Sequence, residues 1–459
     1  MKNRFQRALI AVAALAALGT HLTAQARPDQ VDADLLRTDL RYVASDVLVQ
    51  FRGGHPAAAR EALLSKLGAR SVKALRAAVD GDLHLVRLPQ GLSVSTAIRR
   101  LRAESAVRFV EPNWLYTTQA APNDPYYADG SLWGVYGDTS PGKQNAFGSQ
   151  AAEAWNAGKD CSADVVVGVI DEGVMNTHPD TAANIWSNPG EIANNGIDDD
   201  GNGYIDDVNG WDFVSDDNST FDGVGDDHGT HVSGTIGAVR NNGTGVAGIC
   251  GQVKIVNAKF LGDQGGTTAD AILAVDYITD LKTRHRLNLV ATNNSWGGGG
   301  FSQGLKDAID RAGAANILFM AAAGNGNLIG IGQTTDKKPH YPSSYTSPSI
   351  ISVASITKTG KKSGFSNYGV VSVDLGAPGS AIWSTVPKTV NGVLTPGYAA
   401  YDGTSMATPH VTGAAALYAS LHPGSTAAQI KAAILAAAVP TAALAGKTVT
   451  GGRLDVSGF

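Results

Sequence analysis

The chain has 459 residues, of which 43% are hydrophobic and 17% are charged, and its formal net charge is −5. The length exceeds that of one ordinary domain, and the mixed composition is typical of a globular, soluble protein. The modest charge gives no reason to expect a nucleic-acid partner, because binding of that kind uses a clustered basic face.

The first 26 residues have the pattern of a secretory signal peptide. Basic residues near the N-terminus are followed by the apolar run 8–18, and Ala24-Gln25-Ala26 provides small residues for a cleavage site. A membrane anchor is the alternative, but this apolar run is too short to span a bilayer. We therefore expect cleavage after Ala26 and a secreted, extracellular protein with no membrane association once the signal is removed.

Residues 47–116 predict a small α+β domain. Strand patterns at 47–51 and 83–88 alternate with helix patterns at 57–67 and 95–102, and the segment 107–112 closes the unit. This order is that of a split βαβ, ferredoxin-like domain, which by itself could be a binding module or a regulatory domain. A polar, turn-rich connector at 117–125 follows, and it has the character of an exposed linker open to proteolytic cutting.

Cys161 and Cys250 are the two cysteines of the chain. A redox dithiol more often has the Cys-x-x-Cys spacing, so the alternatives are two free thiols and one disulfide. Because export takes a protein into an oxidising compartment, we expect a Cys161–Cys250 disulfide.

From the connector to Phe459, apolar runs rich in Val, Ile and Ala alternate with helical stretches. These runs cover residues 165–170, 253–261, 287–295, 316–324 and 350–356. Continuous apolar strands predict an α/β fold, a mostly parallel sheet with helices on both faces. Polar residues follow several of these strands, at the carboxyl ends where such folds place their chemistry.

Ser405 lies in the segment DGTSMATPH, residues 402–410, and begins an Ala-rich stretch that predicts a helix. At a helix N-terminus the backbone dipole favours negative charge that develops nearby. The alternative is a helix N-cap, the commoner role of a serine at such a position. This segment alone does not choose between the two roles.

His228 and Asp171 supply the other two groups that acyl transfer needs. His228 begins a predicted helix, with His231 three residues later, whereas zinc pairs of the zincin type have His at i and i+4 with an adjacent Glu. Asp171 ends a buried strand, where a carboxylate needs a partner such as a protonated His. Together with Ser405 they form a candidate nucleophile, base and orienting carboxylate.

The chain order Asp171, His228, Ser405 separates the classes of serine hydrolase. An α/β-hydrolase esterase has the order Ser, Asp, His and a G-x-S-x-G motif, but Ala407 stands here in place of the last glycine. The segments HGTHVSG and GTSMATPH, and VGVIDEGV followed by HPD, resemble the His, Ser and Asp motifs of the subtilisin-like serine proteases, the subtilases. The resemblance covers about residues 124–459.

This resemblance implies a serine endopeptidase that cuts extended polypeptide substrates through an acyl-enzyme. Asn325 matches the oxyanion-hole asparagine of the family; without the match, an Asn before a Gly would more often be a turn. The N-terminal domain resembles the subtilase propeptide, an intramolecular inhibitor, with a first cut expected within 117–121. We therefore expect a signal peptide at 1–26, a propeptide at 27–119 and a catalytic domain at 120–459. Nothing demands an oligomer, and we expect a monomer.

The same resemblance implies residues that bind substrate. Ser295, Trp296 and Gly297 match the strand that lines the S1 pocket, and Gly265 and Gly266 belong to the opposite strand, 262–266. Substrate held between two strand edges is recognised through its backbone, which favours broad specificity. His340, with Asp336 nearby, falls at the pocket floor and is expected to narrow it or to admit a polar or basic side chain.

One residue departs from the family pattern. Glu172 follows Asp171 where subtilases usually carry Thr or Ser. A second carboxylate is expected to perturb the titration of the Asp171–His228 pair.

Two structural Ca²⁺ sites are expected. In the first, loop positions 1, 3, 5 and 7 of an incomplete EF-hand pattern fall on Asp198, Asp200, Asn202 and the Tyr204 carbonyl, with Asp206 or Asp207 closing the site. A solvated acidic loop is the alternative. The second site rests on the resemblance to related subtilases, whose calcium ligands match Asp124, Asp180, Asn242, Thr244 and Val246.

A pseudo-protease that keeps the fold as a binding module is the alternative from another functional class. Because Asp171, His228, Ser405 and Asn325 are all present, the sequence favours an active protease.

Overall fold

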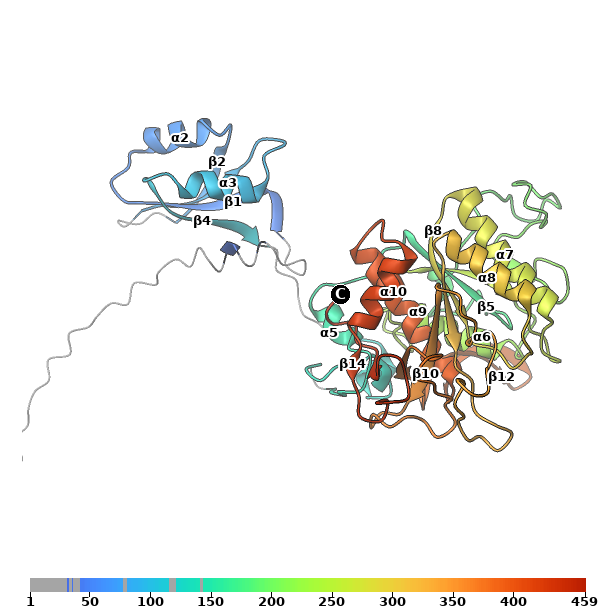
Figure 1. The fold of residues 1–459 in the computed structure, drawn as a ribbon. Helices are drawn as coiled ribbons and strands as arrows, with labels where there is room; N and C mark the ends of the chain where they lie inside the picture. The colour runs from blue at the N-terminus through green and yellow to red at the C-terminus, as the bar shows by residue number, and fades with distance from the viewer. Residues whose placement is uncertain (1–30, 33–34, 36–41, 77–80, 115–120, 141–142) are drawn as a thin grey trace, which may run out of the picture. The chain divides into compact units, whose positions relative to one another are not determined.

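The computed structural model describes residues 31–32, 35, 42–76, 81–114, 121–140 and 143–459 (Figure 1). The chain divides into two compact units, residues 1–118 and 119–459. The expected signal peptide and residues 117–120 of the expected cleavage segment lie outside the described residues. Within the part that is described, no helix is both long and apolar enough to cross a membrane.

Over residues 42–76 and 81–114, the N-terminal unit is a four-stranded antiparallel sheet with helices α2 and α3. Its elements are β1 (Tyr42–Phe51), α2 (Ala57–Ser65), β2 (Arg70–Arg76), β3 (Leu83–Arg87), α3 (Val94–Arg102) and β4 (Val107–Trp114). The strand order β2-β3-β1-β4 is that of the ferredoxin-like fold, which confirms the predicted class. Strand β2 was not predicted, because its charged residues and its exposed Val72 and Leu75 give no buried face.

The core of this unit follows from the spacing of apolar residues in α3. Val94, Ala97, Ile98 and Leu101 recur at helical spacing and are fully buried against the sheet, while the N-cap Ser93 accepts a hydrogen bond from Thr96 N–H. One helix face therefore closes the small core.

The C-terminal unit carries the large sheet. Its strands are β5 (Val165–Asp171), β6 (Gly210–Asp212), β7 (Lys254–Lys259), β8 (Asn288–Asn294), β9 (Leu318–Ala322), β10 (Ile350–Ile356), β11 (Leu375–Pro378), β12 (Ile382–Val390), β13 (Val393–Tyr401), β14 (Val439–Pro440) and β15 (Gly452–Arg453). Its helices are α4 (Pro125–Ala128), α5 (Ala151–Asn156), α6 (Asp227–Gly237), α7 (Thr268–His285), α8 (Gln303–Ala314), α9 (Thr404–Leu421) and α10 (Ala427–Ala436), with short 3₁₀ turns η1 (Trp133–Val135) and η2 (Ala182–Asn184).

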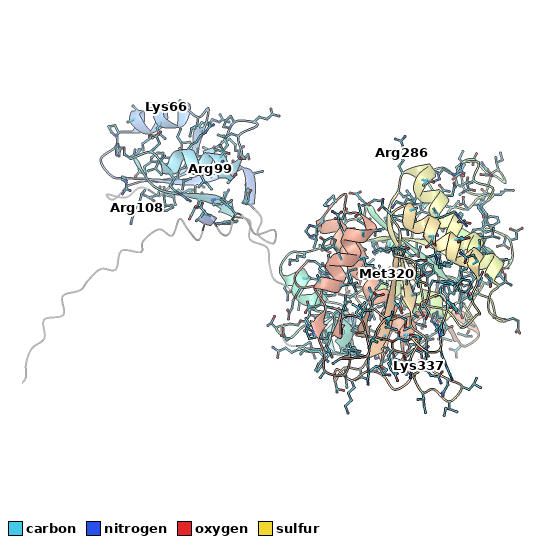
Figure 2. The ribbon with its side chains drawn as sticks, in the orientation of Figure 1. Lys66, Arg99, Arg108, Arg286, Met320 and Lys337 are labelled. Carbon is cyan, nitrogen blue, oxygen red and sulfur yellow. A yellow bond between two sulfur atoms is a disulfide. The ribbon has the colours of Figure 1, made fainter. Side chains whose placement is uncertain are left out.

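Helices cover both faces of the sheet, as the continuous apolar strands predicted. Along β5, Val165, Val167 and Val169 contact the core that contains α6, α9 and α10, whereas Val166 and Ile170 contact the core of α7 and α8. In Figure 1 the pair α7 and α8 lies apart from α9 and α10. Met320 of β9 is fully buried within this unit, whereas Arg286 and Lys337 extend from its surface (Figure 2).

The strand order creates one point where the direction of winding reverses. The sheet runs β14-β15-β11-β10-β9-β8-β5-β7-β6, and it is parallel except for the β14–β15 pair. From β5 the chain passes first to β6 and β7 on one side and then to β8 and β9 on the other. Such a switch point leaves a crevice at the carboxyl ends of the two central strands, here β5 and β8.

A two-stranded hairpin, β12–β13, packs beside α6 and was not predicted. Its turn is Asn391-Gly392, with φ of 52° and 77°, as a type I′ turn requires. The Asn-Gly pair was a usable signal. The hairpin leads directly into α9, so it positions the segment before Ser405.

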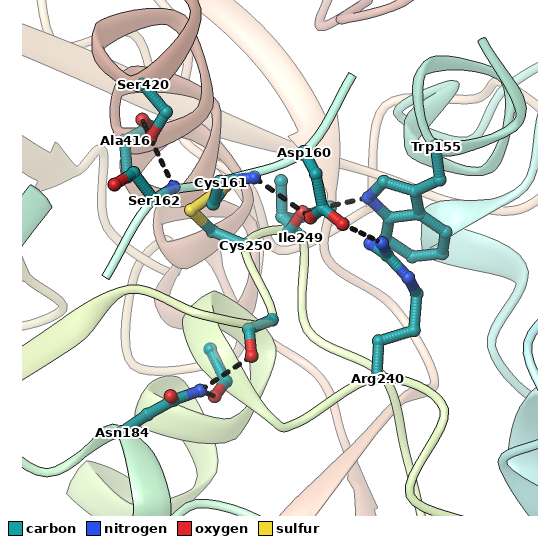
Figure 3. The surroundings of a disulfide bond; sticks show 12 residues. Trp155, Asp160, Cys161, Ser162, Asn184, Arg240, Ile249, Cys250, Ala416 and Ser420 are labelled. Atoms are coloured by element: carbon teal, nitrogen blue, oxygen red, sulfur yellow. Dashed lines mark hydrogen bonds and ion pairs between the residues drawn. A yellow bond between two sulfur atoms is a disulfide. The ribbon is translucent and has the colours of Figure 1, made fainter. Parts of the chain in front are cut away.

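The predicted disulfide is confirmed. Cys161 and Cys250 are bonded, with their Cα atoms 5.3 Å apart, and they tie the segment before β5 to the segment before β7 (Figure 3). Beside the bond, Trp155 Nε1 donates to the Ile249 carbonyl, and the Arg240 guanidinium lies over the Trp155 ring. This end of the sheet is therefore held by a covalent bond within a buried cluster.

Candidate active site

Asp171 and His228 form the central contact of the site. Asp171 ends β5 and is 1% exposed, and its Oδ1 lies 2.8 Å from Nδ1 of His228 in the first turn of α6. Helix α6 approaches β5 closely, since a Cβ on Gly229 would lie 2.1 Å from the carbonyl oxygen of Gly173. Gly229 is therefore required at that position.

The charge of Asp171 favours the protonated imidazole. Burial by itself lowers the pKa of His228, but the Asp171 carboxylate, with smaller contributions from Glu172 and Asp227, raises that pKa to about 9. The bond to Nδ1 also orients the ring, so Nε2 is the nitrogen available to accept a proton. The pair has the arrangement of a general base and its orienting carboxylate.

Ser405 lies in the first turn of α9, between the hairpin and the buried body of that helix. Its Oγ donates to the Ser295 carbonyl over 3.0 Å, and Ser295 Oγ donates back to the Ser405 carbonyl over 2.8 Å. These two bonds fix Ser405 at the carboxyl end of β8, the neighbour of β5. Among the described residues, the hydroxyl is bonded to the Ser295 carbonyl and makes no hydrogen bond to His228.

Asn325 is held beside Ser405 by its carbonyl oxygen. Oδ1 accepts hydrogen bonds from the backbone N–H and the hydroxyl of Thr404, at 2.8 and 2.9 Å, while the residue itself is exposed. With Oδ1 occupied, Nδ2 is the group left to donate to a bound molecule. Thr404 was missed by sequence reasoning, because its role depends on a contact with the end of β9.

The residues predicted to bind substrate meet in part. Gly265, Gly266, Trp296 and Gly297 line one pocket of about 260 Å³, whose other lining residues include Phe260, Leu261 and Tyr341. Ser295 is buried and anchors α9. The pocket therefore combines apolar walls with exposed glycine backbone.

One detail of this prediction is wrong. Residues 262–266 were expected as an extended strand, but Gly262 and Gly265 exchange two backbone hydrogen bonds and form a turn. Gly265 has φ of +82°, which permits that turn. The backbone N–H of each of these two glycines is consequently bonded to the carbonyl oxygen of the other.

His340 lies between the segments that follow β8 and β9. Its ring comes within 2.4 Å of an ideal Cβ on Gly297 and within 2.8 Å of one on Gly324, and burial lowers its pKa. Asp336 instead accepts the backbone N–H groups of residues 370–372, so its carboxylate is already engaged. His340 thus fills space between the two glycines without a charged neighbour in Asp336.

His231 does not join His228 in a metal pair. Its Nε2 hydrogen-bonds the Ile382 carbonyl, its ring stacks on Tyr401 at 4.5 Å, and its pKa is lowered to about 3, mainly by burial. A buried, neutral His231 supports the packing of α6 against the hairpin.

The first expected calcium site is an acidic loop in which backbone N–H groups donate hydrogen bonds to the carboxylates of the same loop. Oxygens of Asp198, Asp200 and Glu191 lie within 4.8 Å of one another, and Glu191 Oε2 is buried without a hydrogen-bond partner among the described residues. Asp207 instead accepts hydrogen bonds from the side chains of Tyr277, Asn188 and Asn202, so it stabilises the loop through these contacts. Asn202 Oδ1 accepts the Tyr204 backbone N–H. The sequence pattern missed Glu191, because it lies outside the loop spacing.

The second expected site brings its residues together. Asp180 accepts from Asn242 Nδ2 and Val246 N–H, each at 2.8 Å, and Asn242 Oδ1 accepts the Thr244 N–H. Asp124 is fully buried, and its Oδ1 has no hydrogen-bond partner among the described residues. Two buried carboxylates with an orphaned oxygen fit a cation, since unpaired buried charge is costly.

Comparison with known proteins shows which family the chain resembles. Residues 162–455 match the Subtilase family, and residues 13–113 match the Fervidolysin N-terminal prodomain. Thermitase from Thermoactinomyces vulgaris is 36% identical over 68% of this chain and 90% of its own length. An extracellular protease of Xanthomonas campestris is 32% identical over 84% of this chain and 62% of its own length.

A solved structure, that of a protease from Pseudoalteromonas arctica, superimposes with a TM-score of 0.58 at 27% identity, over 74% of this chain and 98% of that one. The fold and these similarities define a subtilisin-like hydrolase with an N-terminal prodomain. The chain belongs to the subtilase family of serine endopeptidases. The resemblance that its motifs indicated is thereby confirmed.

Proposed function

We propose that this chain is a secreted serine endopeptidase that cleaves extended polypeptides through the triad Asp171, His228 and Ser405. The observation that carries the proposal is the Asp171–His228 bond at the carboxyl end of β5, with Ser405 and Asn325 fixed at the ends of the next strands. These positions supply a base, a nucleophile and an oxyanion donor at one sheet edge.

Acyl transfer follows from these groups. His228 Nε2 takes the proton of Ser405 Oγ as the oxygen attacks the substrate carbonyl, and Asp171 stabilises the imidazolium that forms. The Ser405 backbone N–H and Asn325 Nδ2 donate to the oxyanion of the tetrahedral intermediate. His228 then protonates the leaving amine, and water attacks the acyl-enzyme with His228 again as base.

Substrate recognition is proposed to rely on backbone and on one apolar side chain. The pocket formed by Gly265, Gly266, Trp296, Gly297 and neighbouring aromatic residues is open to an extended chain. His340, placed between Gly297 and Gly324, is proposed to limit the size of the side chain that enters the S1 pocket.

The prodomain is proposed to act as an intramolecular inhibitor that is removed on maturation. The match of residues 13–113 to a subtilase prodomain supports this role, as does the separate ferredoxin-like unit. Export is supported by the N-terminal pattern of the sequence and by a relative named as extracellular. A monomer with a signal peptide at 1–26 and a propeptide at 27–119 remains our expectation.

Calcium is proposed as a structural cofactor at two places. Asp124, Asp180 and Asn242, with the Thr244 and Val246 backbone, would hold one ion, and Asp198, Asp200 and Glu191, with Asn202 and Tyr204, would hold the other. Such an ion neutralises carboxylates that burial otherwise penalises, and so stabilises the folded chain.

The deciding experiment compares the wild-type chain with Ser405→Ala, by intact mass, N-terminal sequence and hydrolysis of peptide and ester substrates. The wild type should shed its prodomain near residue 120 and cleave peptides, whereas Ser405→Ala should do neither. Peptide hydrolysis retained by Ser405→Ala would remove Ser405 from the mechanism. Wild type that binds polypeptides without cleaving them would indicate a pseudo-protease, and cleavage of esters alone would indicate an esterase.

A further inference from the structure

Glu172, next to Asp171, is connected to both members of the catalytic pair. Its backbone N–H donates to Asp171 Oδ1 over 2.9 Å, and its Oε2 accepts the backbone N–H of His228 at 3.3 Å. His228 Nδ1 lies 2.8 Å from the same Asp171 oxygen. Three hydrogen bonds therefore join these residues in a closed ring between the end of β5 and the first turn of α6.

The Glu172 side chain also places a second carboxylate beside the imidazole. One oxygen from Glu172, one from Asp171 and one ring nitrogen of His228 lie within 4.8 Å of one another. Burial, followed by the Asp171 charge, raises the pKa of Glu172 to about 7. At alkaline pH the imidazole consequently faces two negative charges.

Among the residues that the structure describes, His228 is the basic group that faces the Glu172 carboxylate. The titratable and charged groups around Glu172 are Asp171 at the end of β5, Asp227 and His228 in α6, Tyr401 at the end of β13, and Lys259 at the end of β7. Tyr401 donates its hydroxyl to Asp227. Lys259 donates to the Glu172 backbone carbonyl and forms ion pairs with Asp226, the residue before α6, and with Asp222.

We propose that Glu172 is a positioning residue for His228: it holds the first turn of α6 and stabilises the protonated imidazole that forms during acyl transfer. This inference rests on the proposed function of the same site. It assigns to Glu172 a contribution to rate and to the pH profile that a Thr or Ser at this position does not make.

The distance between the Glu172 carboxylate and the His228 imidazole sets a lower limit on the change in the pKa of His228. Two unit charges 4.8 Å apart change a pKa by about 0.6 units at the dielectric of water, and by more in a less polar medium. Removing the Glu172 charge destabilises the imidazolium, so the pKa of His228 falls. The acid limb, which is the decline of kcat/KM at low pH as His228 becomes protonated, therefore moves to lower pH. The transition state loses the same interaction, so kcat on the alkaline plateau falls about fourfold or more while KM stays unchanged.

The test compares Glu172→Gln, which keeps the acceptor and removes the charge, with Glu172→Asp, which keeps a charge. Asp164→Asn is the control, because this exposed acid lies at the opposite end of β5. The measurements are kcat and KM for a small peptide substrate across the pH range. Glu172→Gln should shift the acid limb by at least about 0.5 pH unit and lower kcat, Glu172→Asp should restore both in part, and the control should change neither.

Failure of this proposal is distinct from failure of the proposed function. A Glu172→Gln enzyme with a wild-type acid limb overturns the proposal, even when its stability or kcat declines, because a purely structural role does not move the limb. Should the wild type lack hydrolysis, NMR titration of the His228 ring in Ser405→Ala, with and without Glu172→Gln, still measures the shift. An unchanged His228 titration in that pair also overturns the proposal.

Discussion

Loss of the Cys161–Cys250 disulfide should lower the free energy of unfolding of the catalytic unit, by an amount that depends on the length of the loop that the bond closes. The bond closes a loop with a sequence separation of 89 residues. The loss of chain entropy in the unfolded state for a loop of that length corresponds to about 4.6 kcal/mol at 25 °C. For a unit of the size of residues 119–459, this free energy is equivalent to a decrease in Tm of roughly 6 °C.

Both cysteines are buried, at 5% and 0% exposure, so the perturbation must avoid adding polar atoms. The variant to measure is Cys161→Ala with Cys250→Ala, built on Ser405→Ala to prevent self-digestion, with the Ser405→Ala protein as control. A serine pair would add the cost of two buried hydroxyl groups and should be less stable still. A decrease in Tm below about 1 °C for the alanine pair would refute the account based on loop entropy.

Three further predictions concern catalysis and metal binding. Asn325→Ala should lower kcat by about 10²–10³ with little change in KM, since Nδ2 donates only to the developing oxyanion; steady-state kinetics showing less than about a tenfold loss would contradict that role. The kcat/KM profile should fall as pH decreases through the pKa of His228, which Asp171 holds above its ordinary 6.5 against the opposing effect of burial, and Asp171→Asn should move this limb to lower pH. EDTA should lower the Tm of the Ser405→Ala protein, and Asp124→Asn with Asp180→Asn should reduce that decrease; an equal Tm with and without EDTA would count against both calcium sites.

Much of the fold could be predicted from local patterns. The five long apolar runs became β5, β7, β8, β9 and β10, because strands buried on both faces are mostly apolar and do not alternate with polar residues. Among the elements that were missed, β2 is largely exposed, β13 has no buried residue and β6 has three residues, whereas β12 is partly buried and pairs with β13. These strands are stabilised by pairing with neighbours, and their own side chains carry little periodic signal.

The sequence alone determined which groups are available for chemistry: Asp171, His228 and Ser405, in an order that identifies the subtilases, and two cysteines. Tertiary structure decided which of these groups meet. The reversal of winding between β5 and β8 brings Asp171 next to the end of the strand that anchors Ser405, and the approach of α6 places Glu172 against His228. Glu191 joined the acidic loop because the chain folds back so that its carboxylate lies near Asp198 and Asp200. Contacts between distant segments depend on how helices and strands pack, and residue spacing within one segment does not encode that packing.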